Sequence, residues 1–158
     1  MATEQPFERI VTEHGAVVLR VCRAVLGRGP DADDAWSETF LAALRAWPDL
    51  APDTNVQAWL VTIAHRKAID VTRARARRAV PVAEPPERAA AAADPVTDAE
   101  LWDRVATLPD KQRLALAYHY FGGLPYPQVA ELIGGSADAA RRAGADGIRA
   151  LRRALTDL

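Results

Sequence analysis

The segment from residue 80 to residue 96, VPVAEPPERAAAAADPV, places four prolines and a run of alanines between two stretches of helical patterning. Each proline lacks a backbone N–H and fixes its own φ angle, so a helix cannot continue through prolines at this density. The segment has no aromatic side chain that a core could bury, and its composition favours an extended, semi-rigid spacer. We therefore expect two helical domains, residues 1–79 and 97–158, joined by a linker over residues 80–96.

Before the spacer, apolar periodicity predicts a bundle of three helices. The first spans Phe7–Leu26 and ends at the glycines and proline of residues 27–30. The second begins among the acids of Asp31–Asp34, which favour the positive end of a helix dipole, and stops at Pro48. The third spans about residues 55–79. We expect the second helix to bury a set of five apolar residues: Ala35, Trp36, Phe40, Leu41 and Leu44.

After the spacer, the pattern predicts four more helices, of which the last two form a helix-turn-helix. A short helix from Tyr126 to Leu132 is followed by a turn in which Gly134 permits a positive φ angle. Ser136 is a natural N-cap for a last helix that continues to about Leu155. The fold class expected for the whole chain is therefore all-α.

Two glycines, Gly144 and Gly147, fall inside this last helix. Each costs about 1 kcal/mol relative to alanine in a helix interior. We therefore expect the glycines to interrupt the helix, which would become fully ordered only when bound to DNA or to a protein partner.

Composition excludes several classes of protein. The chain of 158 residues is 49% hydrophobic and 26% charged, as in globular proteins, and it lacks the ~20 consecutive apolar residues of a membrane span. Its first residues are acidic rather than signal-like, so we expect a cytoplasmic protein without membrane insertion. The single cysteine, Cys22, is expected to be a buried thiol. No catalytic or metal-binding motif is present, so we expect no enzyme activity, no cofactor and no metal.

The formal net charge of −1 hides an uneven distribution of charge. The third helix ends in a basic run opposed only by Asp70, and Trp59 lies upstream of it; this pattern fits either a solvated face or a surface for single-stranded DNA. The last helix is also rich in arginine, which favours DNA over a plain helical hairpin. The acids of the second helix fit either a helix-dipole role or a protein-docking face.

Two blocks of the sequence resemble the extracytoplasmic-function sigma factors of the sigma-70 family. The motifs DADDAWSETF at residues 31–40 and AWLVTIAHRKAID at residues 58–70, followed by Arg73, resemble the second sigma domain. The motifs LPDKQR at residues 108–113 and GLPY at residues 123–126, with the helix-turn-helix, resemble the fourth domain. The likeness spans nearly the whole chain, in the order and at the spacing of the family.

The resemblance implies a sigma factor that binds core RNA polymerase and directs promoter-specific transcription initiation. Residues implied to bind the β′ clamp helices of the polymerase are Asp33, Asp34, Glu38 and Phe40. Residues implied at the −10 element are Trp59, His65, Arg66, Lys67 and Arg73, beside the loop of residues 47–56. Residues implied at the −35 element are Ser136, Asp138, Arg141, Arg142 and Arg149. The other partners implied are the β flap of the polymerase, promoter DNA and an anti-sigma factor.

Two other functions remain open from the sequence. One is a stand-alone helix-turn-helix regulator with a sigma-like fold, and the other is a helical adaptor whose basic faces bind protein. The sigma interpretation requires that both helical modules present a free cationic surface. It would not survive if the folded protein held those arginines in internal salt bridges, or if it formed a single fused bundle with no free face on the third helix.

Overall fold

The computed structural model describes residues 6–78 and 96–156, and these residues form helices and no strand. The expected all-α class is thereby confirmed. The first half contains α1 (Phe7–Leu26), α2 (Pro30–Ala46), the short 3-10 helix η1 (Trp47–Asp49) and α3 (Val56–Arg78). The second half contains α4 (Val96–Thr107), α5 (Asp110–Ala115), the π turn η2 (Leu116–Phe121), α6 (Tyr126–Ile133) and α7 (Ala137–Thr156).

The first half is a three-helix bundle around a core of aliphatic and aromatic side chains. Ile10, Val18 and Cys22 of α1 are buried against α2 and α3. At one end of the bundle the ring centroid of Phe7 lies 6.4 Å from that of Phe40 and 5.9 Å from that of Trp47. Each buried side chain of this size stabilises the fold by about 1.5–3 kcal/mol. The core therefore fixes how α1, α2 and α3 cross.

The thiol of Cys22 is buried as expected. Burial, and to a smaller extent the charge of Asp33, raises its pKa to about 12. The thiol therefore stays protonated near neutral pH.

The expected burial of Leu41 and Leu44 is wrong. Their side chains are 47% and 51% exposed, because the core-facing stripe of α2 runs through Phe40 and Ala43 to Trp47. At about 100° of rotation per residue, Leu41 and Leu44 each lie one step around the helix from this stripe. The outer face of α2 therefore carries two large apolar side chains.

The helix-turn-helix has the expected caps. Gly134 has a φ angle of 86°, in the left-handed region that glycine adopts without strain. The backbone N–H of Ala139 donates to Ser136 Oγ over 3.0 Å, so Ser136 is the N-cap of α7.

The expected interruption of the last helix is wrong, because α7 runs unbroken from Ala137 to Thr156. Both glycines in it are buried at helix crossings. A Cβ atom at Gly144 would lie 2.7 Å from the hydroxyl oxygen of Tyr126, and one at Gly147 would lie 3.3 Å from the carbonyl oxygen of Gln112. The glycines therefore allow α6 and α5 to approach α7 closely, a use of glycine that helix propensity alone does not reveal.

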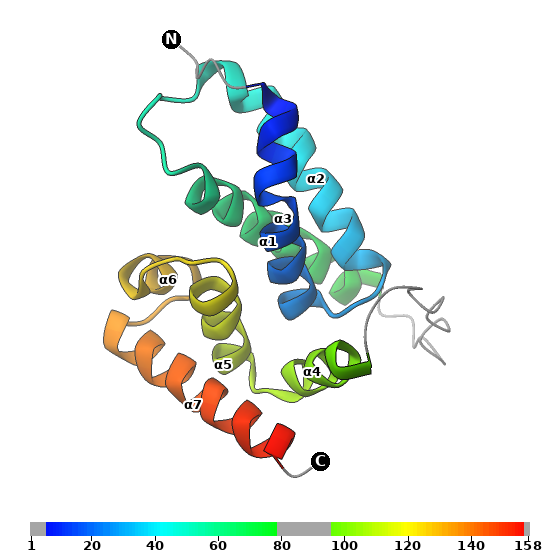
Figure 1. The fold of residues 1–158 in the computed structure, drawn as a ribbon, viewed down its shortest axis with the longest axis vertical. Coiled ribbons are helices and arrows are strands. Elements are labelled where there is room, and N and C mark those ends of the chain that lie inside the picture. Colours follow the sequence, from blue (N-terminus) through cyan, green and yellow to red (C-terminus); the bar gives the residue numbers. More distant parts are fainter. Residues whose placement is uncertain (1–5, 79–95, 157–158) are drawn as a thin grey trace.

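The two halves pack against each other, as Figure 1 shows, rather than standing apart on a tether. Val21 of α1 and Val61 of α3 share a buried cluster with Tyr118 and Leu124 of the second half. Ala24 of α1 joins a further cluster with α4, η2 and α7. The expected linker lies outside the described residues except for Val96, which begins α4. Among the described residues, no helix is long and apolar enough to cross a membrane.

We predict that Gly144→Ala destabilises the protein by about 1 kcal/mol, although alanine is the better helix former. The added methyl group collides with Tyr126, and overpacking of about 1–3 kcal/mol outweighs the gain in helix propensity. Urea denaturation followed by circular dichroism measures the change. In the Tyr126→Phe background the penalty should shrink, because the nearest colliding atom is gone.

The matched control is Gly15→Ala, in the interior of α1. A Cβ atom there would meet the ring of Trp36 at 3.5 Å, an ordinary contact, so this substitution should be stabilising. If both substitutions stabilised the protein equally, the proposed close crossing at Gly144 would be contradicted.

Candidate nucleic-acid interface

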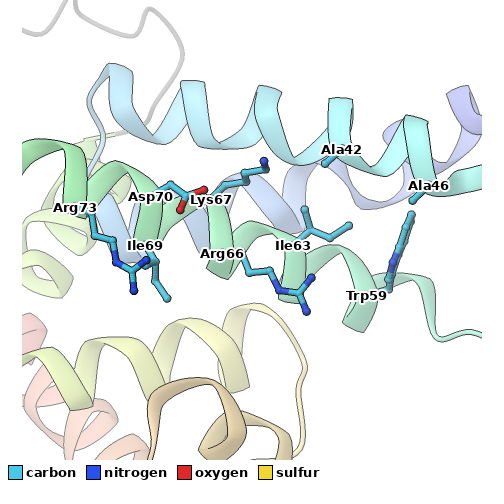
Figure 2. Close-up of a pocket in the computed structure, with 9 residues that line it drawn as sticks. All are labelled: Ala42, Ala46, Trp59, Ile63, Arg66, Lys67, Ile69, Asp70 and Arg73. Carbon is cyan, nitrogen blue, oxygen red and sulfur yellow. The ribbon is translucent and has the colours of Figure 1, made fainter.

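A cavity of about 570 Å³ opens between α2 and α3 (Figure 2). Its lining combines an aromatic ring, aliphatic side chains and four charged groups: Ala42, Ala46, Trp59, Ile63, Arg66, Lys67, Ile69, Asp70 and Arg73. Lys67 and Asp70 point toward α2, whereas Arg66 and Arg73 extend from the other side of α3. Arg66 and Arg73 are exposed. This face therefore places the half-buried ring of Trp59 on the same surface as the exposed cations of Arg66 and Arg73.

Four of the five residues expected at the −10 element line this cavity, and the fifth, His65, does not. His65 is 9% exposed, and its Nδ1 atom lies 2.6 Å from the hydroxyl oxygen of Tyr118 in the second half. Burial lowers the pKa of His65, and the charge of Arg66 lowers it further. In this arrangement the imidazole is thus a neutral packing group, out of reach of DNA.

One arginine of the basic run has an internal role that sequence reasoning missed. The guanidinium of Arg75 forms an ion pair with Asp31 at the start of α2, and its Nη2 atom donates to the carbonyl oxygen of Leu26 over 3.3 Å. Arg75 therefore ties the end of α3 to the connection between α1 and α2. The spacing of 44 residues between Arg75 and Asp31 gives no local signal of this contact.

The acids expected to bind polymerase lie on the outside of α2. Asp33, Asp34 and Glu38 are exposed, whereas Phe40 is only 6% exposed and packs 4.7 Å from Trp36 between ring centroids. Phe40 is therefore part of the hydrophobic core, and its side chain is not available to contact a partner protein. The exposed leucines of α2, at positions 41 and 44, continue the acidic face toward the C-terminal end of the helix. We call these five exposed residues the α2 face: Asp33, Asp34, Glu38, Leu41 and Leu44.

The residues expected at the −35 element, Ser136, Asp138, Arg141, Arg142 and Arg149, are all exposed along α7 and its cap. Arg141 pairs with Asp138 over 2.8 Å, and Arg149 pairs with Asp146 over 3.2 Å. Such exposed pairs contribute about 0–1 kcal/mol, so a phosphate can replace the carboxylate. Arg142 forms no ion pair with another described residue. The arginines of α7 therefore remain available to a polyanion.

The ring of Tyr126, the first residue of α6, contacts the guanidinium group of Arg141, an interaction that sequence reasoning missed. The guanidinium carbon of Arg141 lies 5.3 Å from the centroid of the Tyr126 ring. The ring of His119 stacks nearly parallel on the ring of Tyr126, 3.8 Å away between centroids, and its Nδ1–H donates to the carbonyl oxygen of Leu124. Burial, and to a smaller extent the hydrogen bond with Tyr120, raises the pKa of Tyr126 to about 12, so this ring stays neutral next to the cation of Arg141.

Family models match both halves of the chain. The model for Sigma-70 region 2 matches residues 10–78, and the model for Sigma-70 region 4 matches residues 98–156. Among solved structures, CnrH in complex with the cytosolic domain of CnrY shares the fold with a TM-score of 0.65 and 24% identity, covering 96% of this chain and 88% of CnrH. The sigma factor RpoE of Bartonella quintana, in complex with the anti-sigma factor NepR, has a TM-score of 0.74 at 16% identity, covering 95% and 96%.

Two curated relatives are sigma factors as well. The ECF RNA polymerase sigma factor SigK of Mycolicibacterium vanbaalenii is 37% identical over 110 residues, which are 62% of this chain and 55% of the relative. SigK of Mycobacterium sp. strain JLS is 34% identical over 137 residues, which are 78% of this chain and 69% of the relative. The sequence motifs, the all-helical fold and these matches agree: the chain belongs to the extracytoplasmic-function (ECF) RNA polymerase sigma factors of the sigma-70 family.

Proposed function

We propose that this chain is an alternative sigma factor that binds core RNA polymerase and directs promoter-specific transcription initiation. In this proposal it works in the cytoplasm, by binding and not by catalysis. The observation that carries the proposal is the combination, in one chain, of an open basic and aromatic face on α3 with a capped, arginine-rich helix-turn-helix. A regulator that only binds duplex DNA has no need of the first surface.

The cavity face of α3 is suited to hold a separated strand at the −10 element. An aromatic ring such as that of Trp59 contributes about 1–3 kcal/mol for each stacked base, and the cations of Arg66, Lys67 and Arg73 attract the phosphates. Removing a base from the duplex costs a few kcal/mol, which stacking and charge together can offset. We propose that these residues keep the −10 element open.

Helix α7 is suited to the major groove at the −35 element. Ser136 caps the first turn of α7, where backbone N–H groups can bind a phosphate of the DNA. Arg141 and Arg142 follow within the first two turns of the helix. A pair of hydrogen bonds from arginine to guanine is the commonest specific contact between a protein side chain and a base. We propose that Arg141, held over Tyr126, and Arg142 make base contacts, whereas Arg149 contacts the backbone.

The α2 face is proposed to bind the clamp helices of the β′ subunit, and the second half to contact the β flap. Exposed leucines beside carboxylates provide apolar area and a charge preference for a basic partner. CnrH and the RpoE of Bartonella quintana are each solved with a partner, CnrY and the anti-sigma factor NepR. We propose that an anti-sigma factor covers the same surfaces of this chain and so competes with polymerase.

The direct test is transcription in vitro with core RNA polymerase on a pool of templates whose upstream sequence is randomised. The proposal expects transcripts that start downstream of a shared pair of sequence elements and only when the chain is present. Binding to duplex DNA without such transcripts would instead indicate the stand-alone regulator. Absence of both activities would favour the protein-binding adaptor.

We predict that Arg66→Ala with Arg73→Ala weakens binding of the chain–polymerase complex to a single-stranded oligonucleotide. Loss of two phosphate contacts should reduce the slope of log affinity against log salt by roughly 1.4. Fluorescence anisotropy at several salt concentrations measures both quantities. The control is Arg75→Ala, whose cation pairs with Asp31 in the fold, and which should lower stability without changing the salt slope. Equal slopes for all the variants would contradict the assignment of α3.

We predict that Leu41→Ser with Leu44→Ser reduces affinity for core polymerase about tenfold while leaving stability nearly unchanged. Both side chains are about half exposed, so their loss changes the free energy of unfolding by less than about 0.5 kcal/mol each. Biolayer interferometry with immobilised core polymerase measures the affinity. Ala16→Ser, at an exposed position of α1 outside both proposed polymerase contacts, is the control, and its effect on affinity should be small. Equal effects of the variant and its control would argue against docking through the α2 face.

A further inference from the structure

The guanidinium group of Arg141 is held by two neighbours, although the side chain is exposed on α7. Its carbon atom lies 5.3 Å from the centroid of the Tyr126 ring, and its Nη1 atom donates to Oδ1 of Asp138 over 2.8 Å. The face of the ring attracts the cation, whereas the carboxylate accepts a hydrogen bond from it. Because the two contacts restrain the same planar group in different ways, Arg141 is partly ordered before a ligand binds.

The ring of Tyr126 is itself fixed by its surroundings. The ring of His119 in η2 stacks on it with an angle of 16° between the planes, and the hydroxyl group hydrogen-bonds with that of Tyr120. The crossing of α6 and α7 brings the ring next to Gly144, where an added Cβ atom would lie 3.2 Å from Cε1 of Tyr126. A ring confined in this way has little rotamer freedom, so it gives the guanidinium group of Arg141 a fixed support.

The other two arginines proposed at the −35 element have no such support. Neither Arg142 nor Arg149 lies over an aromatic ring of residues 6–78 or 96–156. Arg149 pairs with Asp146 over 3.2 Å, and both residues are exposed. Because exposed ion pairs contribute little, Arg142 and Arg149 keep most of their rotamer freedom until they bind DNA. Arg141 therefore differs from the other two arginines in geometry and not in charge.

The support leaves most hydrogen-bond donors of the guanidinium group free. A guanidinium group carries five N–H donors in its plane, and the pair with Asp138 uses one of them. Two others can match the O6 and N7 acceptors of guanine in the major groove, while the attraction to the Tyr126 ring needs no donor. An arginine that is ordered in advance loses less rotamer freedom on binding, which favours this two-bond contact.

We propose that Tyr126 is a positioning residue for base recognition: its ring orients the guanidinium group of Arg141 so that α7 selects a guanine at one position of the −35 element. The inference rests on the proposed function and deepens it, because it names the base and the residue that prepares the contact. Tyr126 acts through Arg141 and does not itself touch the base. The aromatic ring carries the effect and the hydroxyl group does not, because a cation is attracted by the face of the ring.

The test selects duplexes from a pool of randomised sequence, with the full-length chain alone and in complex with core polymerase. Sequencing of the bound duplexes gives the preference for each base at each position. Arg141→Ala identifies the position that Arg141 reads, because the preference for guanine should be lost there. Arg142→Ala identifies the position that Arg142 reads in the same way, and this second position is the internal control.

Tyr126→Leu should lower the preference for guanine at the position read by Arg141 by roughly twofold to fivefold, the contribution of an exposed contact between a cation and a ring. The preference at the position read by Arg142 should stay as in the wild type. Tyr126→Phe keeps the face of the ring and should keep the preference for guanine. In the Arg141→Ala background, Tyr126→Leu should have no further effect on base preference, because the residue through which it acts is gone.

A second measurement uses the wild-type side chains, so it does not depend on the folding of Tyr126→Leu. Nuclear magnetic resonance of the arginine Nε–H groups gives an order parameter for each side chain in the chain without DNA. The order parameter of Arg141 should exceed that of Arg142, since of these two only Arg141 lies over a described ring.

The outcomes separate the role of Tyr126 from the proposed function. Equal order parameters for Arg141 and Arg142, an unchanged preference for guanine in Tyr126→Leu, or a loss of preference shared equally by all positions would each overturn this role, even with normal transcription. Equal losses in Tyr126→Leu and Tyr126→Phe would also overturn it, because they would indicate the hydroxyl group. The expected loss at one position, without transcription in vitro, would overturn the sigma function and leave the role of Tyr126 supported. No enrichment of any duplex would overturn both.

Discussion

The fold depends on α1 being covered by helices of both halves. Ile10, Val18 and Cys22 on one side of this helix complete the core of the first half. Val21 and Ala24, at the edge of the same apolar stripe, belong to the two clusters that include the second half. The apolar stripe of α1 is wider than its contact with α2 and α3, whereas its opposite side, with Thr12, Glu13 and Arg20, is exposed. The packing of the second half onto the first is therefore a consequence of the composition of α1.

Much of the fold could be predicted from the sequence because helix limits and caps are local properties. Gly27 ends α1 and Ser136 caps α7, and both act within one turn of their own position. The predictions that were wrong concern residues whose environment is set by segments distant in the sequence. The exposure of Leu44 depends on which stripe of α2 meets α1 and α3, and the role of Gly144 depends on a tyrosine 18 residues earlier in the chain. Helix propensity and periodicity contain neither piece of information.

The candidate site was predictable as a set of elements but not residue by residue. Exposed arginines at the end of α3 and along α7 follow from charge clustering in the sequence. Adjacent positions on a helix, however, differ by about 100° in direction, so His65 is buried in the contact between the halves while Arg66 is exposed. Arg75 is likewise indistinguishable from Arg73 by sequence, yet it pairs with Asp31. Which side chains of α3 pack inside the protein and which stay exposed is therefore known only from the positions of the neighbouring helices.

The internal packing of α3 also decides which of its surfaces stays free. Arg66 and Arg73 lie about 120–140° around α3 from Val61, so the packing of Val61 and His65 against the second half leaves the two arginines accessible. In the proposed function, a DNA strand can therefore bind Arg66 and Arg73 while Val61 and His65 keep their contacts with the second half.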